Sequence, residues 1–473
     1  MMTNTSEVNL LTRLDRIPIT RGIVALIALL SLVWLAEAFD IGIVGPVLST
    51  LEKSWKLSAS QTGLLAIAST LGVVIGMIPS GVIADRYGRR RVVLLGILWF
   101  SVLTIIGALV ANVWSLFAIR LLAGVGEGAV LPMPYLILSE FTGRSRRAIS
   151  VGYANGILTA AYIVPSVVSL WALHAYSPDF AWRVPFLLGG IPLLMLIPIY
   201  FFLPESPRYL LEKGKIDRVR HMVERLENQA SLPHDESLHD DAIQASLEAT
   251  PHALLDTVLA LLRQPLLGRT IMVVLHLTAA LLLFYVLQVF GPTLLIARGF
   301  ATSNSILYTG LMMLLAGVGS IVQGHLSDHY GRKNILSWYV ALATVGCLLF
   351  AFTSATWSVF LAGFLTAFFG LGIFPVSKLC VAEQYPTDLR GRGVYINEMI
   401  ARGLSGVVTT YFIPTLLKVW SNETIFFAIA IVLIAFSLPF LFFGRETSNK
   451  QLELATSVVP NDKLSLSRVK DRG

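Results

Sequence analysis

Charge is scarce in this sequence. Only 14% of its 473 residues are Asp, Glu, Lys or Arg, whereas 55% are hydrophobic. Soluble domains usually carry about 25% charged residues, so a surface that faces only water is excluded. The mean hydropathy is +0.71, and the hydrophobic residues form runs of roughly 20, long enough as helices to cross a bilayer core of about 30 Å. We therefore expect most of the surface to contact lipid.

Cysteines and chemical motifs are scarce as well. The two cysteines, Cys347 and Cys380, lie inside hydrophobic runs, and their spacing fits no metal site. The sequence contains no Gly-Lys-Ser/Thr nucleotide loop, no nucleophile–base spacing and no cluster of metal ligands. These absences argue against an enzyme and against a nucleotide-driven pump. We expect no cofactor and no metal, and a proton gradient as the driving force.

The hydrophobic runs predict an all-α membrane protein with twelve transmembrane helices. Only helices and closed barrels satisfy the backbone hydrogen bonds in lipid, and runs of about 20 residues are too long for barrel strands. The runs divide into two bundles of six helices, 22–203 and 268–444. The predicted helices are 22–48, 59–83, 90–110, 113–140, 147–173, 183–203, 268–297, 304–326, 333–353, 356–382, 391–417 and 422–444.

The charges of the connections predict the orientation. Basic residues cluster after the second, fourth, eighth and tenth helices, whereas the links 111–113 and 353–357 carry no charge. By the positive-inside rule the basic connections are cytoplasmic, and so are both termini. The net charge of +7 therefore follows the membrane topology and gives no reason to expect a nucleic-acid partner. We expect a multi-pass protein of a cell membrane, in particular a bacterial inner membrane.

Three segments lie outside the two predicted bundles. Residues 1–21 interleave apolar positions with arginines, which favours an amphipathic helix on the cytoplasmic leaflet over a disordered tail. Residues 204–267 are polar with an apolar stripe at helical spacing and predict a cytoplasmic helical linker. Residues 445–473 are polar and predict a cytoplasmic tail.

The two bundles repeat one another. Residues 81–90 match residues 324–333 at an offset of 243. Several matches at one constant offset indicate a duplicated six-helix unit, an arrangement that places a substrate site near the bilayer midplane between the halves. Three further pairs have the same offset: Pro132 and Pro375, Glu140 and Glu383, and Arg147 and Arg390.

The repeated segment suits a tight turn between two helices. Its glycines permit unusual backbone angles, its acidic residue can sit at the N-terminus of a neighbouring helix, and its arginines can pair with the glutamates that end the fourth and tenth helices. The alternative is that these charges only set the topology. The residues of the two turns and their expected partners are Gly81, Asp85, Arg86, Gly88, Arg89, Glu140, Arg147, Asp328, Gly331, Arg332, Glu383 and Arg390.

These features resemble the major facilitator superfamily along nearly the whole chain. Residues 81–90 fit the superfamily's loop between helices two and three, and the resemblance implies that the residues just given form a conformational latch that closes the cytoplasmic side. Three further stretches resemble the sugar-porter and organic-ion branches: Arg120-x3-Gly124-x-Gly126-x-Gly128, Pro204-Glu-Ser-Pro-Arg208, and Glu383-x-Tyr-Pro-Thr-x2-Arg390-Gly391.

Ionisable residues inside membrane helices usually mark function. Asp40 on the first helix and Arg120 on the fourth lie at about the same depth, roughly 10 Å from the outer ends, so we expect a buried pair. The resemblance to sugar porters implies that Asp40 takes the coupling proton and that Arg120 modulates its affinity. The alternative is a static salt bridge. Glu37 and Glu127 lie nearby along the same helices and either share or relay the proton or line the cavity.

The second half has its own membrane charges. Lys378 on the tenth helix lies at the depth of Glu398 on the eleventh, and a pair between them would free Arg402 to bind an anion. Arginine suits a carboxylate because its fork donates two parallel hydrogen bonds. In the organic-anion branch that this stretch resembles, an arginine at this place is linked to anion binding. The alternative is a pair between Glu398 and Arg402 with no ligand. A lone membrane histidine such as His276 is more often packed than a proton carrier.

The seventh helix disfavours a sugar, because a polyhydroxyl ligand needs many side-chain hydrogen bonds and this helix offers a single glutamine. We predict uptake of a small organic acid or aromatic carboxylate by proton symport, by a functional monomer whose partners are the bilayer, the anionic substrate and protons. The alternatives are efflux by proton antiport, sugar:proton symport and a membrane ligand sensor. Besides Glu398 and Arg402, the expected substrate site contains Tyr135, Asn155, Phe284, Tyr285, Gln288, Tyr395 and Asn397.

Overall fold

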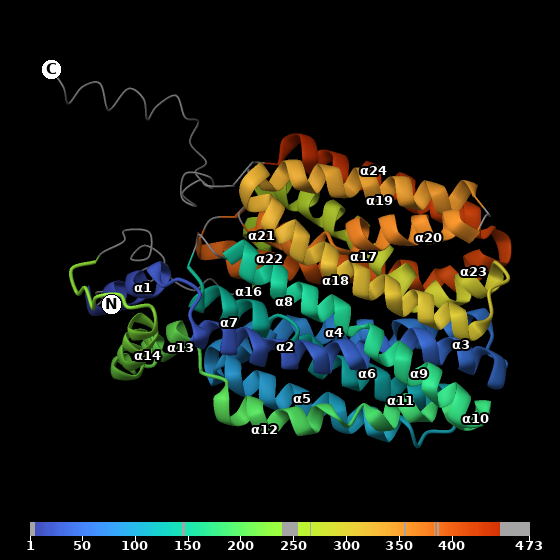
Figure 1. Ribbon diagram of the computed structural model, residues 1–473, viewed down its shortest axis with the longest axis horizontal. Helices are drawn as coiled ribbons and strands as arrows, with labels where there is room; N and C mark the ends of the chain where they lie inside the picture. The colour runs from blue at the N-terminus through green and yellow to red at the C-terminus, as the bar shows by residue number, and fades with distance from the viewer. Residues whose placement is uncertain are drawn as a thin grey trace.

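A computed structural model describes residues 5–143, 147–238, 254–264, 266–353, 356–382, 384–385 and 387–444. Over these residues the chain contains twelve helical stretches long and apolar enough to cross a membrane, running roughly side by side along the long axis (Figure 1). This confirms the predicted all-α fold with twelve spans. The stretches are Arg21–Glu52, Ala59–Tyr87, Arg89–Gly107, Val113–Phe141, Ile149–Ala175, Asp179–Phe202, Leu266–Ala297, Thr302–Ser327, Arg332–Phe352, Trp357–Val381, Gly393–Val419 and Asn422–Phe443.

Several of these spans consist of two or three shorter helices. The helices of the first half are α2 (Arg21–Gly42), α3 (Val44–Ser54), α4 (Ala59–Tyr87), α5 (Arg89–Gly107), α6 (Val113–Val130), α7 (Met133–Phe141), α8 (Arg147–Ala161), α9 (Ile163–Ala175), α10 (Pro178–Ala181), α11 (Arg183–Leu188) and α12 (Pro192–Phe202). Those of the second half are α17 (Leu266–Ala297), α18 (Thr302–Tyr330), α19 (Arg332–Phe352), α20 (Thr356–Leu365), the π-helical turn η2 (Thr366–Leu371), α21 (Phe374–Ala382), α22 (Thr387–Arg402), the π-helical turn η3 (Gly403–Thr409), α23 (Thr410–Val419) and α24 (Asn422–Phe443).

Prolines account for the breaks. A proline inside a helix removes a donor and its ring clashes with the carbonyl four residues earlier. Helix α2 ends four residues before Pro46, α8 four residues before Pro165, and η2 four residues before Pro375. Each break lies in the middle of a span, where the two halves of the protein meet, so irregular backbone is placed beside the interior rather than beside lipid.

Glycines let the helices of one half approach closely. Added Cβ atoms at Gly124 and Gly128 on α6 would overlap the carbonyl oxygens of Ser69 and Val73 on α4. An added Cβ at Gly126 would lie 2.6 Å from Trp99 on α5. The glycine-rich stretch of α6 is therefore explained by packing against two neighbouring helices.

Replacing Gly124 with alanine is expected to destabilise the protein, because α4 and α6 would have to separate to admit the new Cβ. Overpacking of this kind costs about 1–3 kcal/mol. The matched control is Gly81→Ala, since an added Cβ at Gly81 meets nothing within 4 Å. Thermal unfolding of the purified full chain in detergent measures the difference. Equal melting temperatures for the two variants would contradict the close α4–α6 contact.

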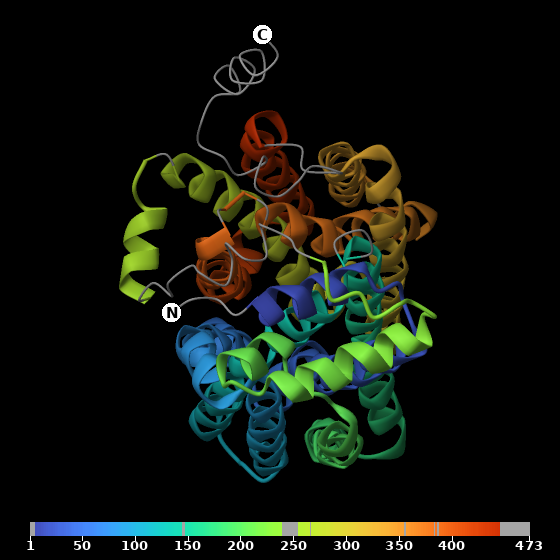
Figure 2. The same cartoon turned by 90° about the vertical axis from the view of Figure 1, so that its left-hand side faces the viewer.

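Four further helices, α1 (Thr5–Arg16), α13 (Pro207–Glu212), α14 (Ile216–Gln229) and α16 (Leu254–Leu261), belong to the N-terminal and linker segments. Viewed from that end, α1 (dark blue) and α14 (green) lie side by side across the ends of the membrane helices (Figure 2). We call this the linker end of the molecule. Helices are present in the described residues of the predicted linker and N-terminal segment. The apolar side chains of α1, such as Leu10 and Leu14, are buried within the protein and so are not exposed for contact with a leaflet.

A buried ion pair joins α1 to α14. Arg13, 1% exposed, donates to both carboxyl oxygens of Glu227, which is fully buried, at 3.0 and 2.5 Å. His234 and Arg16 contact the same carboxylate at 2.7 and 3.2 Å. Burial alone would raise the pKa of Glu227, but the hydrogen bonds from Arg13, His234 and Arg16 outweigh it, so the pKa lies below its ordinary value of 4.5.

Acid is expected to release α1 from α14. A carboxyl group with a lowered pKa in the folded state stabilises above its unfolded pKa, and the contribution disappears as pH falls through the folded value. The contact should therefore hold at neutral pH and open only well below pH 4.5. At neutral pH, Glu227→Gln should open it, because Arg13 would lose its buried partner at a cost of about 3–5 kcal/mol. Fluorophores on α1 and α14, followed by energy transfer during an acid titration, report the opening. Asp217→Asn, at an exposed position on α14, is the control, and an unchanged contact in Glu227→Gln would be contrary to this account.

Candidate transport site

The first half holds a buried carboxylate–arginine pair at its centre. The Nη1 of Arg120 on α6 lies 2.8 Å from Oδ2 of Asp40 on α2, and its Nη2 donates to the Asp40 carbonyl oxygen at 3.0 Å. Thr104 on α5 donates to the other carboxyl oxygen, and the guanidinium lies 5.7 Å from the ring centre of Phe186. Asp40 is 1% exposed and Arg120 is 2% exposed. The contact expected from equal depth is present, whereas its role in proton coupling stays a prediction.

Two more carboxyl groups lie beside this pair. Glu127 on α6 is fully buried, with Oε1 3.9 Å from Nη2 of Arg120. Glu37 on α2 is fully buried too, and among the described residues neither of its carboxyl oxygens has a hydrogen-bond partner. An unpaired ionised carboxylate is costly to bury, so these are positions where gain of a proton removes a large energetic penalty.

The second half holds a three-membered cluster of charges. Oε1 of Glu398 on α22 accepts from Nη2 of Arg402 at 2.8 Å and lies 3.2 Å from Nζ of Lys378 on α21. Arg402 also donates to the hydroxyl of Tyr285 on α17 at 2.9 Å. Lys378 lies 4.1 Å from the ring centre of Tyr135 on α7, a residue of the first half.

The expected pair between Lys378 and Glu398 is present, but it does not release Arg402, which stays bound to Glu398 in this structure. Glu398 is shared by both cations, because Arg402 lies one turn along the same helix while Lys378 reaches across from α21. The cluster of Lys378, Glu398 and Arg402 thus holds two positive charges and one negative charge, and it carries an excess of positive charge.

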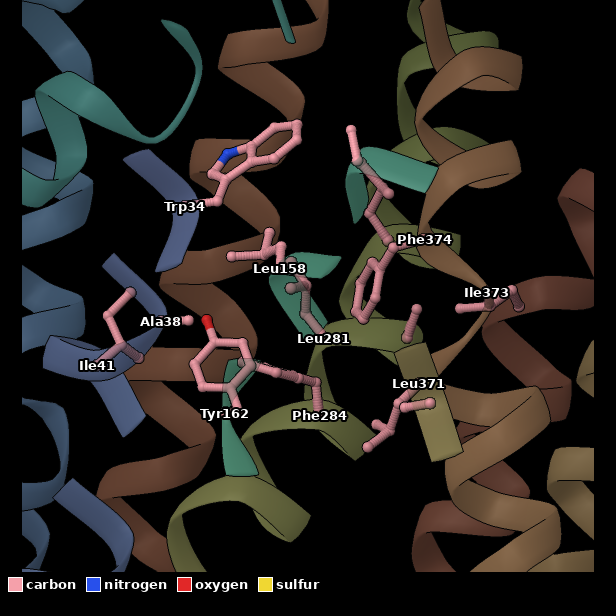
Figure 3. Close-up of a cluster of buried hydrophobic side chains, with 14 of the residues drawn as sticks. Trp34, Ala38, Ile41, Leu158, Tyr162, Leu281, Phe284, Leu371, Ile373 and Phe374 are labelled. Atoms are coloured by element: carbon pink, nitrogen blue, oxygen red, sulfur yellow. The ribbon is translucent and has the colours of Figure 1, made fainter. Parts of the chain in front are cut away.

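Aromatic side chains of both halves are buried together, among them Tyr162, Phe284 and Phe374 (Figure 3). They adjoin the charged cluster, because Tyr285, the neighbour of Phe284 on α17, accepts a hydrogen bond from Arg402. The Tyr162 ring lies 5.5 Å from that of Phe284 on α17, and Phe284 lies 5.9 Å from Phe374, the first residue of α21. Trp34 on α2 packs on Tyr135 at 4.6 Å. Sequence reasoning found Phe284 and Tyr135 but missed the other three. Tyr162 and Phe374 each lie within a few residues of a mid-span proline, which breaks the helix. The prolines were therefore the feature of the sequence that could have identified both residues.

Hydrogen bonds connect the halves through other predicted site residues. The Tyr135 hydroxyl donates to Oδ1 of Asn155 on α8 at 2.6 Å, and Asn155 donates to Ser320 on α18 at 3.1 Å. The amide of Gln288 on α17 donates to the carbonyl oxygen of Ile41 at 3.1 Å. Tyr135, Asn155 and Gln288 therefore lie at the interface where a substrate site is expected.

Asn397 faces away from the charged cluster, and its place in the substrate site stays a prediction. Its amide donates to the Tyr385 hydroxyl at 2.9 Å and to the Gly393 carbonyl at 2.5 Å, on a different side of α22 from Glu398. Adjacent residues on a helix point about 100° apart, and a sequence pattern does not show which one faces the interior. Tyr395 packs with Val73 and Met77 of α4, nearer the linker end.

The halves contact one another on both sides of the charged layer. Towards the linker end, Tyr395 and Met399 on α22 pack on Val73 and Met77 of α4. Towards the opposite end, an added Cβ at Gly63 on α4 would lie 2.5 Å from the Tyr411 carbonyl oxygen on α23. Along the side of the bundle, α8 runs against α18 (Figure 1). This packing buries the charged side chains, with Glu398 and Arg402 8% exposed.

Comparisons with known proteins place the chain in a family. The Major Facilitator Superfamily pattern matches residues 30–409, and a second match covers 279–472. The chain belongs to the major facilitator superfamily. It is a multi-pass membrane transporter of that superfamily. The fold resembles the solved structure of the proton:xylose symporter XylE bound to 6-bromo-6-deoxy-D-glucose. The TM-score is 0.73 at 19% identity, and the match covers 92% of this chain and 98% of that one.

Several curated members of the superfamily resemble the chain over nearly its whole length. The niacin transporter NiaP of Acinetobacter baylyi is 26% identical over 446 residues, covering 94% of this chain and 99% of the relative. The inner membrane metabolite transport protein YdjE of Escherichia coli is 27% identical over 457 residues, covering 94% and 98%. The benzoate transport protein of Acinetobacter baylyi is 26% identical over 400 residues, covering 82% of each.

The superfamily's loop motif forms the turn between α4 and α5. Gly88 has a φ of +97° and Gly331, its counterpart between α18 and α19, has a φ of +88°, a region that favours glycine. Arg89 pairs with Asp85 at 3.3 Å and lies 3.7 Å from Glu140 on α7. The two turns thus share their backbone geometry, as the repeat predicts.

The acid at the N-terminus of α5 is not Asp85 but Glu205 of the linker. Its Oε1 accepts from the backbone N–H groups of Arg89 and Arg90 at 2.9 and 3.2 Å, where the helix dipole favours a negative charge. Arg86 is exposed, and its guanidinium lies 5.3 Å from the centre of the Tyr87 ring.

In the second half, Arg332 follows Gly331 at the start of α19 and is buried. The remaining predicted latch residues cannot be placed in the same way, because Glu383 and the side chains of Arg147, Asp328 and Arg390 lie outside the described residues.

His276 on α17 is fully buried and holds three helices of the major facilitator bundle together. Its Nε2 lies 3.0 Å from the Ser377 hydroxyl on α21, its Nδ1 lies 3.1 Å from that of Ser437 on α24, and its ring stacks on Phe440. Both ring nitrogens are occupied by hydroxyl partners, which fits the packed histidine expected from the sequence.

Proposed function

We propose that this transporter takes up a small organic acid, in particular an aromatic carboxylate, together with protons by alternating access. The observation that carries the proposal is the cluster of Lys378, Glu398 and Arg402, whose excess positive charge lies between the halves. A carboxylate would balance that charge, and the guanidinium of Arg402 can donate two parallel hydrogen bonds to it. The relatives named above include transporters of niacin and of benzoate, which agrees with this chemistry.

The aromatic residues beside the cluster suit the ring of such a substrate. Phe284, Tyr162 and Phe374 meet edge to face, and a bound ring can join this arrangement by stacking or edge contacts. A sugar suits this site less well, because a sugar needs many side-chain hydrogen bonds and Gln288, the single glutamine of α17, already donates to the Ile41 carbonyl oxygen. We expect sugar:proton symport to be absent for this reason.

We assign the proton chemistry to the first half. Asp40 accepts the proton when its contact with Arg120 loosens, and Arg120 sets the affinity of Asp40 for that proton. Glu127 lies within reach of Arg120, and Glu37 lies one helical turn from Asp40, so these two carboxyl groups can share or relay the proton. The turns at Gly88 and Gly331, with Arg89 and Glu140, are proposed to act as the latch at the linker end.

We place the linker end in the cytoplasm, because the basic connections lie at that end, and we propose a functional monomer in a bacterial inner membrane. Efflux by proton antiport uses the same residues and differs in the direction of coupling. A ligand sensor is less well supported, because the relatives named above are transporters over nearly the whole of this chain.

Uptake into proteoliposomes tests the proposal. Radiolabelled nicotinate, benzoate and xylose are each offered to vesicles that contain the purified full chain, with and without an inward proton gradient. We expect the two acids to accumulate only with the gradient and xylose not to enter. Protein-free vesicles are the control, since undissociated acids cross bilayers unaided. Xylose uptake without acid uptake would overturn the substrate class.

A further inference from the structure

Glu37 is the buried carboxyl group whose surroundings connect the two halves. It belongs to α2 of the first half. One turn earlier on α2, Trp34 packs on the Tyr135 ring at 4.6 Å, and Lys378 of the second half lies 4.1 Å from the centre of the same ring. Arg402 and Lys378 are the cations that act on Glu37 most strongly. The carboxylates that act on Glu37 most strongly are Glu398 on α22 and Asp40 on α2. Among the described residues no hydrogen bond satisfies either carboxyl oxygen.

Other titratable groups face the same space. The rings of Tyr135 and Tyr162, from α7 and the α8–α9 break, are within electrostatic range of Glu37, and so is the carboxyl group of Glu127 on α6. The two tyrosines are neutral when protonated. Glu127 lies against Arg120 rather than against the second-half cluster. The balance of charge at the interface therefore depends on Glu37 and on the cluster of Lys378, Glu398 and Arg402.

The charges of this group add up in a way that sets a condition on ligand binding. The cluster holds two cations and one carboxylate, so it carries one unbalanced positive charge. An ionised Glu37 cancels that charge. The carboxylate of a substrate would cancel it as well, but both together would leave one unbalanced negative charge in a buried, low-dielectric site, which is strongly unfavourable.

We propose that Glu37 competes electrostatically with the substrate carboxylate for Arg402 and Lys378, so that the anion binds only when Glu37 is protonated. This inference rests on the proposed function and names the point where proton and substrate meet. A proton relayed from Asp40 adds to the Glu37 carboxylate and forms a neutral carboxylic acid, with no other bond made or broken. The freed positive charge then receives the substrate anion, so that proton and substrate cross together with no net charge.

Equilibrium binding to the purified full chain tests the inference. Affinities for nicotinate and benzoate are measured by calorimetry from neutral to alkaline pH, in two buffers of different ionisation enthalpy to count the protons exchanged. At pH values where free Glu37 is ionised, the unmodified protein is expected to take up about one proton per anion, and its affinity should fall about tenfold per pH unit. Glu37→Gln, which mimics the protonated side chain, should bind the anion with a pH-independent affinity and no proton uptake.

Two further variants complete the test. Glu37→Asp keeps a titratable carboxyl group and should retain proton-linked binding, and Asp217→Asn, at an exposed position on α14, should behave as the unmodified protein. Proton-linked binding that persists in Glu37→Gln would overturn the inference and leave the proposed function intact. Loss of binding in Glu37→Gln but not in Glu37→Asp would overturn it as well. Failure of the unmodified protein to bind either acid at any pH would instead overturn the proposed substrate class.

Discussion

Proton-driven accumulation is expected to disappear when Asp40 is replaced by asparagine, while exchange of substrate across the membrane survives. One proton carried per anion lets a gradient of one pH unit sustain about tenfold accumulation, equivalent to about 1.4 kcal/mol. Asparagine cannot accept the proton, although it keeps the size of the side chain and can still contact Arg120, 2.8 Å away in the native pair. The accumulation ratio should therefore fall to about one.

The measurement compares gradient-driven uptake with counterflow of labelled substrate in vesicles preloaded with unlabelled substrate. Asp179→Asn, the same chemical change at an exposed position on α10, is the matched control and should retain full accumulation. If the Asp40→Asn protein accumulated substrate as the unmodified chain does, the pair with Arg120 would be a static salt bridge, and the coupling proton would have to be carried elsewhere.

Substrate affinity is expected to fall about 30-fold or more when Arg402 is replaced by glutamine, because removal of one member of a buried, hydrogen-bonded charge pair costs roughly 2–5 kcal/mol and each 1.4 kcal/mol is about tenfold. Arg402 binds Glu398 and the Tyr285 hydroxyl in the unliganded protein, and we expect the substrate carboxylate to take over its donors. Arg402→Lys keeps the charge but cannot donate two parallel hydrogen bonds. Its substrate affinity should lie between that of the unmodified protein and that of Arg402→Gln.

A second substitution separates the charge of Arg402 from its donor geometry. Arg402→Gln leaves Glu398 and Lys378 as a one-to-one buried pair within the cluster, so the charges that remain there are balanced. The double variant Glu398→Gln/Arg402→Gln leaves Lys378 as the one charge of the cluster, which restores the excess positive charge at a cost in stability, and we expect nicotinate binding not to recover. Recovery of binding in the double variant would show that Arg402 serves only to neutralise Glu398.

The sequence predicts features that depend on position along a helix better than features that depend on rotation about it. Asp40 and Arg120 lie at equal depth on neighbouring helices, and their contact was predictable because burial of either charge alone is so costly. Asn397 and Glu398 are adjacent, and the same reasoning did not show that Asn397 faces Tyr385 while Glu398 faces Lys378. The sharing of Glu398 between Lys378 and Arg402 depends on how α21 and α22 are rotated towards each other, which no local pattern encodes.

Contacts between segments that are far apart in the chain could not be predicted from the sequence either. An amphipathic pattern in residues 5–16 is equally consistent with a lipid surface and with a protein partner, and the partner proved to be α14. Glu205 is far from Arg89 in the chain, so its capping of α5 could not be read from residues 81–90. The mid-span prolines, by contrast, mark the helix breaks directly, and they place Tyr162 and Phe374 beside the site.

The duplicated halves have kept a common backbone and divided the charges. Gly88 and Gly331 repeat the same turn geometry, whereas the first-half pair of Asp40 and Arg120 has no counterpart at the corresponding positions, Leu283 and Gly363. We infer that the shared scaffold supports alternating access, that the first half handles the proton and that the second half recognises the substrate charge. Glu37 is the group through which the two tasks are linked.

The direction of proton movement on substrate addition tests this account most directly. Nicotinate is added to proteoliposomes that enclose a pH-sensitive dye, with no gradient imposed, and the signal is compared with that of Asp40→Asn vesicles, which report passive entry of the undissociated acid. The account predicts acidification of the lumen beyond that background, in step with nicotinate uptake and with no accompanying electrical current. Alkalinisation of the lumen, or nicotinate entry through the protein with no change in pH, would contradict it.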